Sequence, residues 1–286
     1  MGLRLLLVFA TLLAAGQAQS VKIYSEFQRI DPFGAVVAAD RAERPREILS
    51  PALARNAYAT FQAVVTVPEG QQYGLFIAQN PDDAVRPTAY KPVYVKRGEA
   101  WIPDALEPLT ISDAGQVAAF AHQVPGQTVT VVWIDMWVAP NATVRRTRFE
   151  VQLNVGEQWI IYPMELRIIS PMIPASSGAL EPLAPLEASA AGTAAAPLRA
   201  YACAIEETSE EGPLTIRRLI RRNARQDMAL ARSLGRPALA TEILTALGAA
   251  DRTKWCEAPS GPPQLGAEWY LRVRDYLYGT AIKPPQ

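Results

Sequence analysis

Residues 57–67 limit how this chain can fold, because apolar and polar side chains alternate along them. The sequence AYATFQAVVTV places Phe61 and Val65 on one side of an extended strand and Gln62 on the other. A period of two residues is typical of a β-sheet that has one face in a hydrophobic core. The same alternation returns in two later segments, 149–155 and 164–168.

Short strand-like segments separated by turn-forming residues continue from about residue 21 to residue 169. Turns such as Pro68-Glu69-Gly70 lie between them. No helical periodicity alternates with the strands, which argues against a parallel α/β sheet. We therefore expect an immunoglobulin-like antiparallel β-sandwich. Its further strand candidates are 21–27, 34–39, 73–78, 92–96, 117–122 and 128–138.

Changes of composition along the chain predict four parts. Residues 1–18 combine Arg4, an apolar run and small residues near Ala18, as a secretory signal does. Pro, Ala and Ser dominate a predicted linker, and helical spacing of apolar residues follows it. The fold class expected is mainly β with a small α part. Its predicted parts are a signal peptide at 1–18, a β-sandwich at 19–170, a linker at 171–198 and a disulfide-stapled helical region at 199–286.

The predicted signal peptide implies export to the periplasm or the cell exterior. Its apolar run is shorter than the roughly 20 residues that a transmembrane helix needs. No later stretch is long and apolar enough to span a bilayer. We therefore expect no transmembrane segment after signal cleavage.

Two cysteines, Cys203 and Cys256, flank the first two predicted helices. In an exported protein such a pair predicts a disulfide, which would staple a unit with little core of its own. The alternative is two free thiols or metal ligands. The chain has a single histidine, His122, and it lacks phosphate-loop, dinucleotide-binding and serine-hydrolase motifs. We therefore predict no metal and no cofactor.

Charges balance over the whole chain, with 28 Lys+Arg and 28 Asp+Glu, so no nucleic-acid partner is expected. The first predicted helix is a local exception, because its arginines come in pairs one turn apart. Such a helix can bind an anionic polymer, a membrane surface or an acidic partner. The alternative is a solvated helix face neutralised by nearby acids. The arginines concerned are Arg217, Arg218, Arg221, Arg222 and Arg225.

Trp133, Asp135 and Trp137 alternate on one face of segment 128–138, whose opposite face is wholly apolar. Tryptophan rings stack on sugars and anchor protein interfaces, which makes these three residues ligand-binding candidates. The alternative is a covered strand, since apolar side chains on both faces are typical of a central strand. The sequence leaves open whether this face meets a ligand or the protein's own helices.

Two stretches together resemble a known family. These are LSPALARNAYATFQAVV at 49–65 and VWIDMWVAPNA at 132–142. They are similar to strands in the N-terminal β-sandwich domain of glycoside hydrolase family 123-like proteins, over roughly residues 45–170. The resemblance implies the sandwich fold.

The chain also departs from that family. Ala57 stands where an acidic residue usually follows Arg-Asn, and Val144–Arg148 replaces a Gly-x-Tyr-x-Gly segment. About 115 residues follow the sandwich, whereas a (β/α)8 barrel takes about 250 residues. We therefore expect the catalytic barrel to be absent, and none of the family's catalytic residues is carried over.

These patterns predict an exported, non-catalytic binding or assembly module of the cell envelope or exterior. Its partner would be a carbohydrate or an envelope protein. One alternative is a hydrolase that acts on glycans through an unrecognised carboxylate pair. Another is a purely structural envelope protein, in which the helices cover Trp133 or Trp137.

Overall fold

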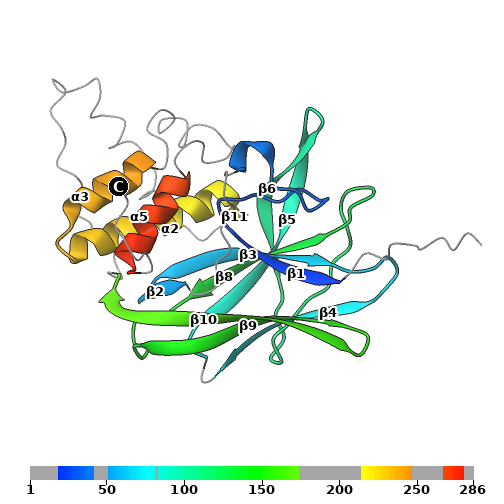
Figure 1. Ribbon diagram of the computed structural model, residues 1–286, viewed down its shortest axis with the longest axis horizontal. Helices are drawn as coiled ribbons and strands as arrows, with labels where there is room; N and C mark the ends of the chain where they lie inside the picture. Colours follow the sequence, from blue (N-terminus) through cyan, green and yellow to red (C-terminus); the bar gives the residue numbers. More distant parts are fainter. Residues whose placement is uncertain (1–18, 42–50, 81–82, 174–213, 247–266, 280–286) are drawn as a thin grey trace, which may run out of the picture.

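The computed structural model describes residues 19–41, 51–80, 83–173, 214–246 and 267–279. Two stacked sheets form a β-sandwich, and helices lie on the outer side of one sheet (Figure 1). The predicted mainly β fold with a small α part is confirmed. The predicted signal peptide, most of the predicted linker, and both cysteines of the predicted disulfide lie outside the described residues.

The first sheet has six strands in the order β1-β3-β8-β5-β6-β11, and every neighbouring pair is antiparallel. Its central strands β3 and β8 are buried over nearly their whole length. The strands span β1 Ser20–Ser25, β3 Tyr58–Thr66, β8 Thr130–Trp137, β5 Arg86–Arg97, β6 Ala100–Leu109 and β11 Leu214–Thr215.

The second sheet has five strands in the order β2-β10-β9-β4-β7. All its pairs are antiparallel except β2 with β10, which run parallel. The strands span β2 Ala52–Arg55, β10 Gln158–Met172, β9 Arg145–Val155, β4 Tyr73–Asn80 and β7 Gln116–Val117.

The strand candidates differ from the structure in several places, and the short strands β2 and β11 are among the elements without a counterpart. Residues 34–39 form only a bridge at Val36 and part of the 3-10 helix η1 Ala38–Asp40, and candidate 117–122 reduces to the end of β7. Strand β6 had no counterpart among the predicted strands, because it contains Pro103 and Pro108. A proline removes a ladder donor, and β6 tolerates two because β11 pairs with it only at Ala105 and Leu106.

The space between the sheets is filled by one face of each strand. Phe61 of β3 meets Phe149 of β9 edge to face, with ring centroids 5.9 Å apart. Aliphatic side chains such as Ile134 and Leu166 complete this inner core. The alternation predicted for residues 57–67 thus places Phe61 and Val65 between the sheets, as expected.

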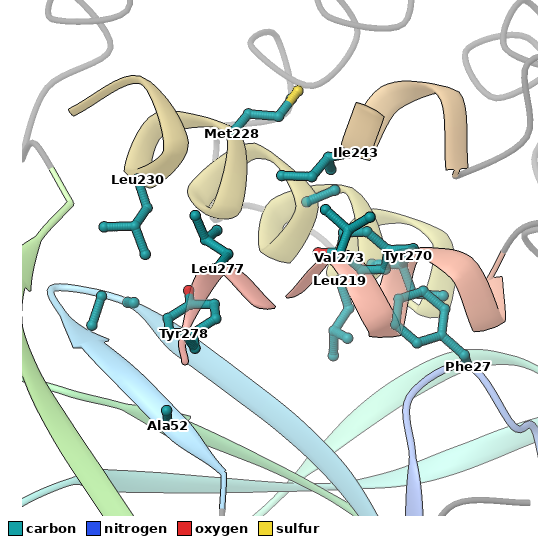
Figure 2. Packing of buried hydrophobic residues seen from close by; sticks show 14 of the residues in the cluster. Phe27, Ala52, Leu219, Met228, Leu230, Ile243, Tyr270, Val273, Leu277 and Tyr278 are labelled. Carbon is teal, nitrogen blue, oxygen red and sulfur yellow. The ribbon is translucent and has the colours of Figure 1, made fainter. Parts of the chain in front are cut away.

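A second apolar cluster lies on the outer face of the six-stranded sheet, beneath the helices. It joins sheet residues such as Val64, Leu106 and Trp133 to the buried faces of the helices. Figure 2 shows helical side chains meeting there, among them Leu219, Leu230, Ile243, Tyr270, Val273 and Leu277. The helices are α2 Ile216–Ser233, α3 Pro237–Ala246 and α5 Ala267–Leu277. The six-stranded sheet is therefore covered on both faces.

Local signals fix the ends of α2. The hydroxyl of Thr215 accepts a hydrogen bond from the backbone N–H of Arg218 at 3.2 Å, which caps the first turn. At the other end, Gly235 has a φ of 69°, which glycine adopts without strain. The backbone N–H groups of Gly235 and Arg236 close that end on the carbonyls of Arg232 and Ala231.

Candidate functional site

The face predicted to carry a ligand lies where α2 packs on β8 and β3. Trp133 belongs to the apolar cluster beneath the helices and is 0% exposed. Asp135 is buried beside it, whereas Trp137 at the end of β8 keeps some exposed surface. An exposed stripe of all three residues is therefore not what the structure contains, since no ligand can stack on Trp133 in this arrangement.

Asp135 and Arg222, each singled out from the sequence, pair with each other. Nη2 of Arg222 on α2 lies 2.7 Å from both carboxylate oxygens of Asp135 on β8. The hydroxyl of Thr60 donates a third hydrogen bond to this carboxylate at 2.6 Å. The guanidinium of Arg222 also lies 3.8 Å over the ring of Tyr58. These contacts fasten α2 to the sheet and occupy both groups.

Trp137 lies in a short stack at the rim of this junction. Its ring is 6.5 Å from that of Tyr58, and the guanidinium of Arg86 lies 5.3 Å from its ring centroid. Nε1 of Trp137 donates to the side-chain oxygen of Asn56 at 3.4 Å. Trp137 is thus the one of the three ligand-binding candidates that solvent still reaches.

The remaining basic candidates do not form a described free surface. Arg218 and Arg225 are partly buried, and both interact with other groups of the chain. The backbones of Arg217 and Arg221 lie in α2, but their side chains are outside what the structure describes. The pairing of Arg222 with Asp135 assigns Arg222 a role at the junction between α2 and the sheet.

A buried network of charged and polar groups, which the sequence analysis did not predict, continues beneath α2 and α5. Nη1 of Arg274 lies 2.8 Å from Oε1 of Glu26, and its Nε lies 3.4 Å from Oδ2 of Asp227. The hydroxyls of Tyr270 and Tyr278 both donate to Asp227. The network thus ties α2 and α5 to the chain after β1.

Asn223 joins this network to the Asp135 pair. Its amide nitrogen contacts Glu26 at 3.3 Å and the hydroxyl of Thr60 at 3.2 Å. A sequence signal existed for Asp227, because it occupies an apolar position of the helical repeat. A buried acid on such a face requires a partner, although the sequence does not say which residue supplies it.

Burial governs the protonation of these groups. Desolvation raises the pKa of Glu26 and of Asp227, and the positive charge of Arg274 opposes that shift in both. Burial alone would lower the pKa of Arg274, but the carboxylates of Asp227 and Glu26 raise it well above its usual value. The carboxyl groups of Glu26 and Asp227 are both buried. They therefore hold the helices in place and present no acid or base to a substrate.

Solvent reaches a different tryptophan, on the outer face of the five-stranded sheet. Trp159 and Ile161 of β10 are 52% and 48% exposed. The ring of Phe76 on β4 lies 5.3 Å from that of Trp159 at an interplanar angle of 43°. We call Phe76, Trp159 and Ile161 the open-face patch. Residues 159–162 are all apolar or aromatic, so no alternation marked the exposed positions, and the sequence analysis chose the tryptophans of β8.

Polar side chains of β9 run between the two sides of the open-face patch. The carboxylate of Glu150 accepts a hydrogen bond from Nε2 of Gln152 at 2.5 Å and pairs with Arg148. The strand register places Gln152 between Phe76 on β4 and Ile161 on β10. Hydrogen-bonding groups therefore lie directly beside exposed apolar ones.

Two further searches of the structure bear on other functions. Within the described ranges, no group of three or more His, Cys, Asp or Glu side chains converges as a metal site requires. No helix in the described part of the chain is both long and apolar enough to cross a membrane.

Comparisons with known proteins define no family for this chain. No family model matches it, and no curated protein does. Among solved structures, a family 123 glycoside hydrolase from Clostridium perfringens matches 55% of this chain at 9% identity and a TM-score of 0.37. This chain spans 28% of the length of that enzyme.

Two other solved structures match about half of this chain. AvmM, which catalyses macrocyclization in alchivemycin A biosynthesis, matches 55% of this chain and 91% of its own at 7% identity, with a TM-score of 0.28. The C-terminal domain of the Streptococcus agalactiae AgI/II polypeptide BspA matches 52% of this chain and 49% of its own at 10% identity and a TM-score of 0.28. A likeness at this level does not define a shared function.

Proposed function

We propose that this protein is an exported, non-catalytic binding module of the cell envelope or exterior. It engages a carbohydrate or an envelope protein through the outer face of the five-stranded sheet. The observation that carries this proposal is the exposure of Trp159 and Ile161 side by side on β10. Large apolar side chains grouped on a surface are typical of interaction sites.

The outer face of the six-stranded sheet is a poorer candidate for the binding surface. Trp133 is buried, and the buried carboxylate of Asp135 is already paired with Arg222, so neither side chain is accessible to a partner. On the open face, no described helix covers the patch, because the helices pack mainly on the other sheet and reach the five-stranded sheet at β2 and near Arg167 of β10 (Figure 1). The role of the helical region in this proposal is to complete the fold.

Sedimentation with isolated cell envelopes of the producing organism tests the proposal. The wild-type chain is expected to sediment with envelopes, and the double variant Trp159→Ala/Ile161→Ala is expected to stay in solution. Phe33→Ala is the matched control, because it removes an exposed aromatic side chain outside the five-stranded sheet. Equal sedimentation of the wild type and the double variant, or none by either, would contradict the proposed role of this face.

A further inference from the structure

We infer that the partner bound by the open-face patch is a carbohydrate chain, with a sugar ring stacked on Trp159 and its hydroxyls bonded by β9. This inference rests on the proposed function, and it names the chemical class of the partner. Three observations carry it: the position of the aromatic rings, the polar pair beside them, and the small apolar area.

The first observation is that Phe76 lies low against the sheet. A Cβ atom added to Gly74, its neighbour on the same face of β4, would lie 2.7 Å from Cε2 of Phe76. The ring therefore occupies the space that a side chain at position 74 would fill. Together with Trp159, whose ring lies 5.3 Å away between centroids and is tilted by 43°, it forms a two-ring aromatic surface instead of one protruding anchor. Such a surface suits the flat apolar face of a sugar ring.

The second observation is a hydrogen-bonded row on β9, which begins at Gln152, the register partner of Phe76, and continues through Glu150 to Arg148. Glu150 is largely buried, with 12% of its side chain exposed, and it accepts from Gln152 while pairing with Arg148, whose side chain is 60% exposed. Since Gln152 donates its amide nitrogen to Glu150, its carbonyl oxygen points away from that carboxylate and can accept. The guanidinium of Arg148 has further donors. The carbonyl oxygen of Gln152 can accept from a sugar hydroxyl, and the guanidinium of Arg148 can donate to one. Glu150 holds both side chains in place.

The third observation is size, which separates a glycan from a folded protein partner. A large aromatic side chain carries about 150–250 Å² of surface, so the open-face patch exposes on the order of 250 Å² of apolar area. A stable protein interface buries about 800 Å² on each partner, with an apolar core. The open-face patch falls well short of that core, and polar side chains interrupt it. One or two sugar units need no more apolar area than it offers.

The experiment treats the same envelopes in two ways before sedimentation. Periodate cleaves the vicinal diols of sugars, whereas protease removes surface protein. We expect periodate to abolish the Trp159-dependent sedimentation and protease to leave it unchanged. An array of immobilised glycans, probed with the purified full chain, then identifies the sugar. On it, Trp159→Ala is expected to bind about tenfold more weakly or worse, and Phe33→Ala as well as the wild type.

Gly74→Ala is a second, milder variant that tests the aromatic surface itself. Its added methyl group displaces the ring of Phe76 and is expected to weaken glycan binding less than Trp159→Ala does. Sedimentation that depends on Trp159 but survives periodate and is lost after protease would overturn the carbohydrate inference. That result would leave the proposed binding face intact. Loss of Trp159 dependence altogether would instead contradict the proposed function.

Discussion

The two outer faces of this sandwich each place a tryptophan on a strand, yet Trp133 on one face is buried and Trp159 on the other is exposed. On the six-stranded sheet, Trp133 and Asp135 lie beneath α2. On the five-stranded sheet, Trp159 is exposed, with Asn154 as its register partner on β9. The strands look alike in composition, so composition does not distinguish a core from a binding surface.

The polar neighbours distinguish the two faces. The carboxylate of Asp135 accepts hydrogen bonds from Arg222 and Thr60, and these contacts join α2 to the sheet. The polar groups beside Trp159 are held by one another, and Arg148 still faces solvent. A buried charge must be paired internally, whereas an exposed polar group can exchange water for a ligand.

The largest effect expected from this comparison is a difference between two tryptophan deletions. Trp133→Ala removes a fully buried ring and is expected to lower the free energy of unfolding by about 3–5 kcal/mol. Trp159→Ala loses mainly its contact with Phe76 and is expected to cost about 1 kcal/mol or less. Denaturant unfolding of both variants measures the difference. Similar costs for the two would mean that the helices do not cover Trp133 as described.

The next effect concerns the pair that joins α2 to β8. Arg222→Met leaves the buried carboxylate of Asp135 with Thr60 as its remaining described partner, and we expect a loss of about 2–4 kcal/mol. Adding Asp135→Asn is expected to recover part of that loss, because no uncompensated charge then remains. A double variant that is less stable than Arg222→Met would contradict this account of the junction. Thermal or denaturant unfolding provides the comparison.

A smaller effect is expected at the start of α2. Thr215→Ala removes the side-chain acceptor for the N–H of Arg218 and is expected to cost about 1 kcal/mol. Thr215→Ser keeps the hydroxyl and serves as the control, with little change in unfolding free energy. Because the helices pack mainly on the six-stranded sheet and reach the five-stranded sheet at β2 and near Arg167 of β10, neither variant is expected to change binding at the open-face patch. A loss of binding in Thr215→Ala alone would show that the two faces are coupled.

The subtlest effect is a pH dependence from the buried network. Burial raises the pKa of Glu26 and Asp227 above their ordinary values of 4.5 and 3.8, so the folded chain holds these protons more tightly than the unfolded chain. Their contribution to stability is fully present below about pH 4 and is lost as pH rises through the folded-state pKa values. Arg274 limits this loss. Glu26→Gln, which is always neutral, is expected to gain stability relative to the wild type as pH rises above about 4.

Unfolding curves of Glu26→Gln and the wild type at several pH values give this measurement. A stability difference that stays constant with pH would contradict the raised pKa of Glu26. A difference that moves in the opposite direction would mean that the carboxylate is stabilised, and not penalised, by its surroundings. The same curves in Trp159→Ala should follow the wild type, because Trp159 lies on the other sheet.

The sandwich could be predicted because apolar and polar side chains alternate within single strands, such as residues 57–67. Helix ends were predictable for a similar reason, since Gly235 and Gly279 stop helices locally and both adopt positive φ. Strand β6 was missed, because its two prolines argue against a strand. The sequence does not show that β11 pairs with only two residues of β6 and leaves the rest of that edge open. The strand candidates 34–39 and 117–122 were apolar stretches without enough pairing partners.

The candidate site was less accessible from sequence, because exposure depends on which sheet the helices cover. Apolar side chains on both faces of 128–138 indicated a covered strand, but residues 159–162 are equally apolar, so this signal does not say which tryptophan α2 will cover. The pairing of Asp135 with Arg222 joins residues 87 positions apart. Each was identified as chemically important, but as a group awaiting a partner outside the chain. The sequence does show an acid, Asp227, on an apolar helix face, but it does not show that Arg274 is its partner.

Oxidative footprinting of tryptophan side chains, located by mass spectrometry, tests the contrast between the two faces most directly. Hydroxyl radicals modify a side chain in proportion to its exposure to solvent, so one experiment compares Trp133 and Trp159 in the free chain and with the glycan identified on the array. We predict that Trp159 is modified in the free chain and protected by the glycan, and that Trp133 is unreactive in both states. Modification of Trp133 in the folded free chain, or a Trp159 that the bound glycan leaves unprotected, would contradict this account.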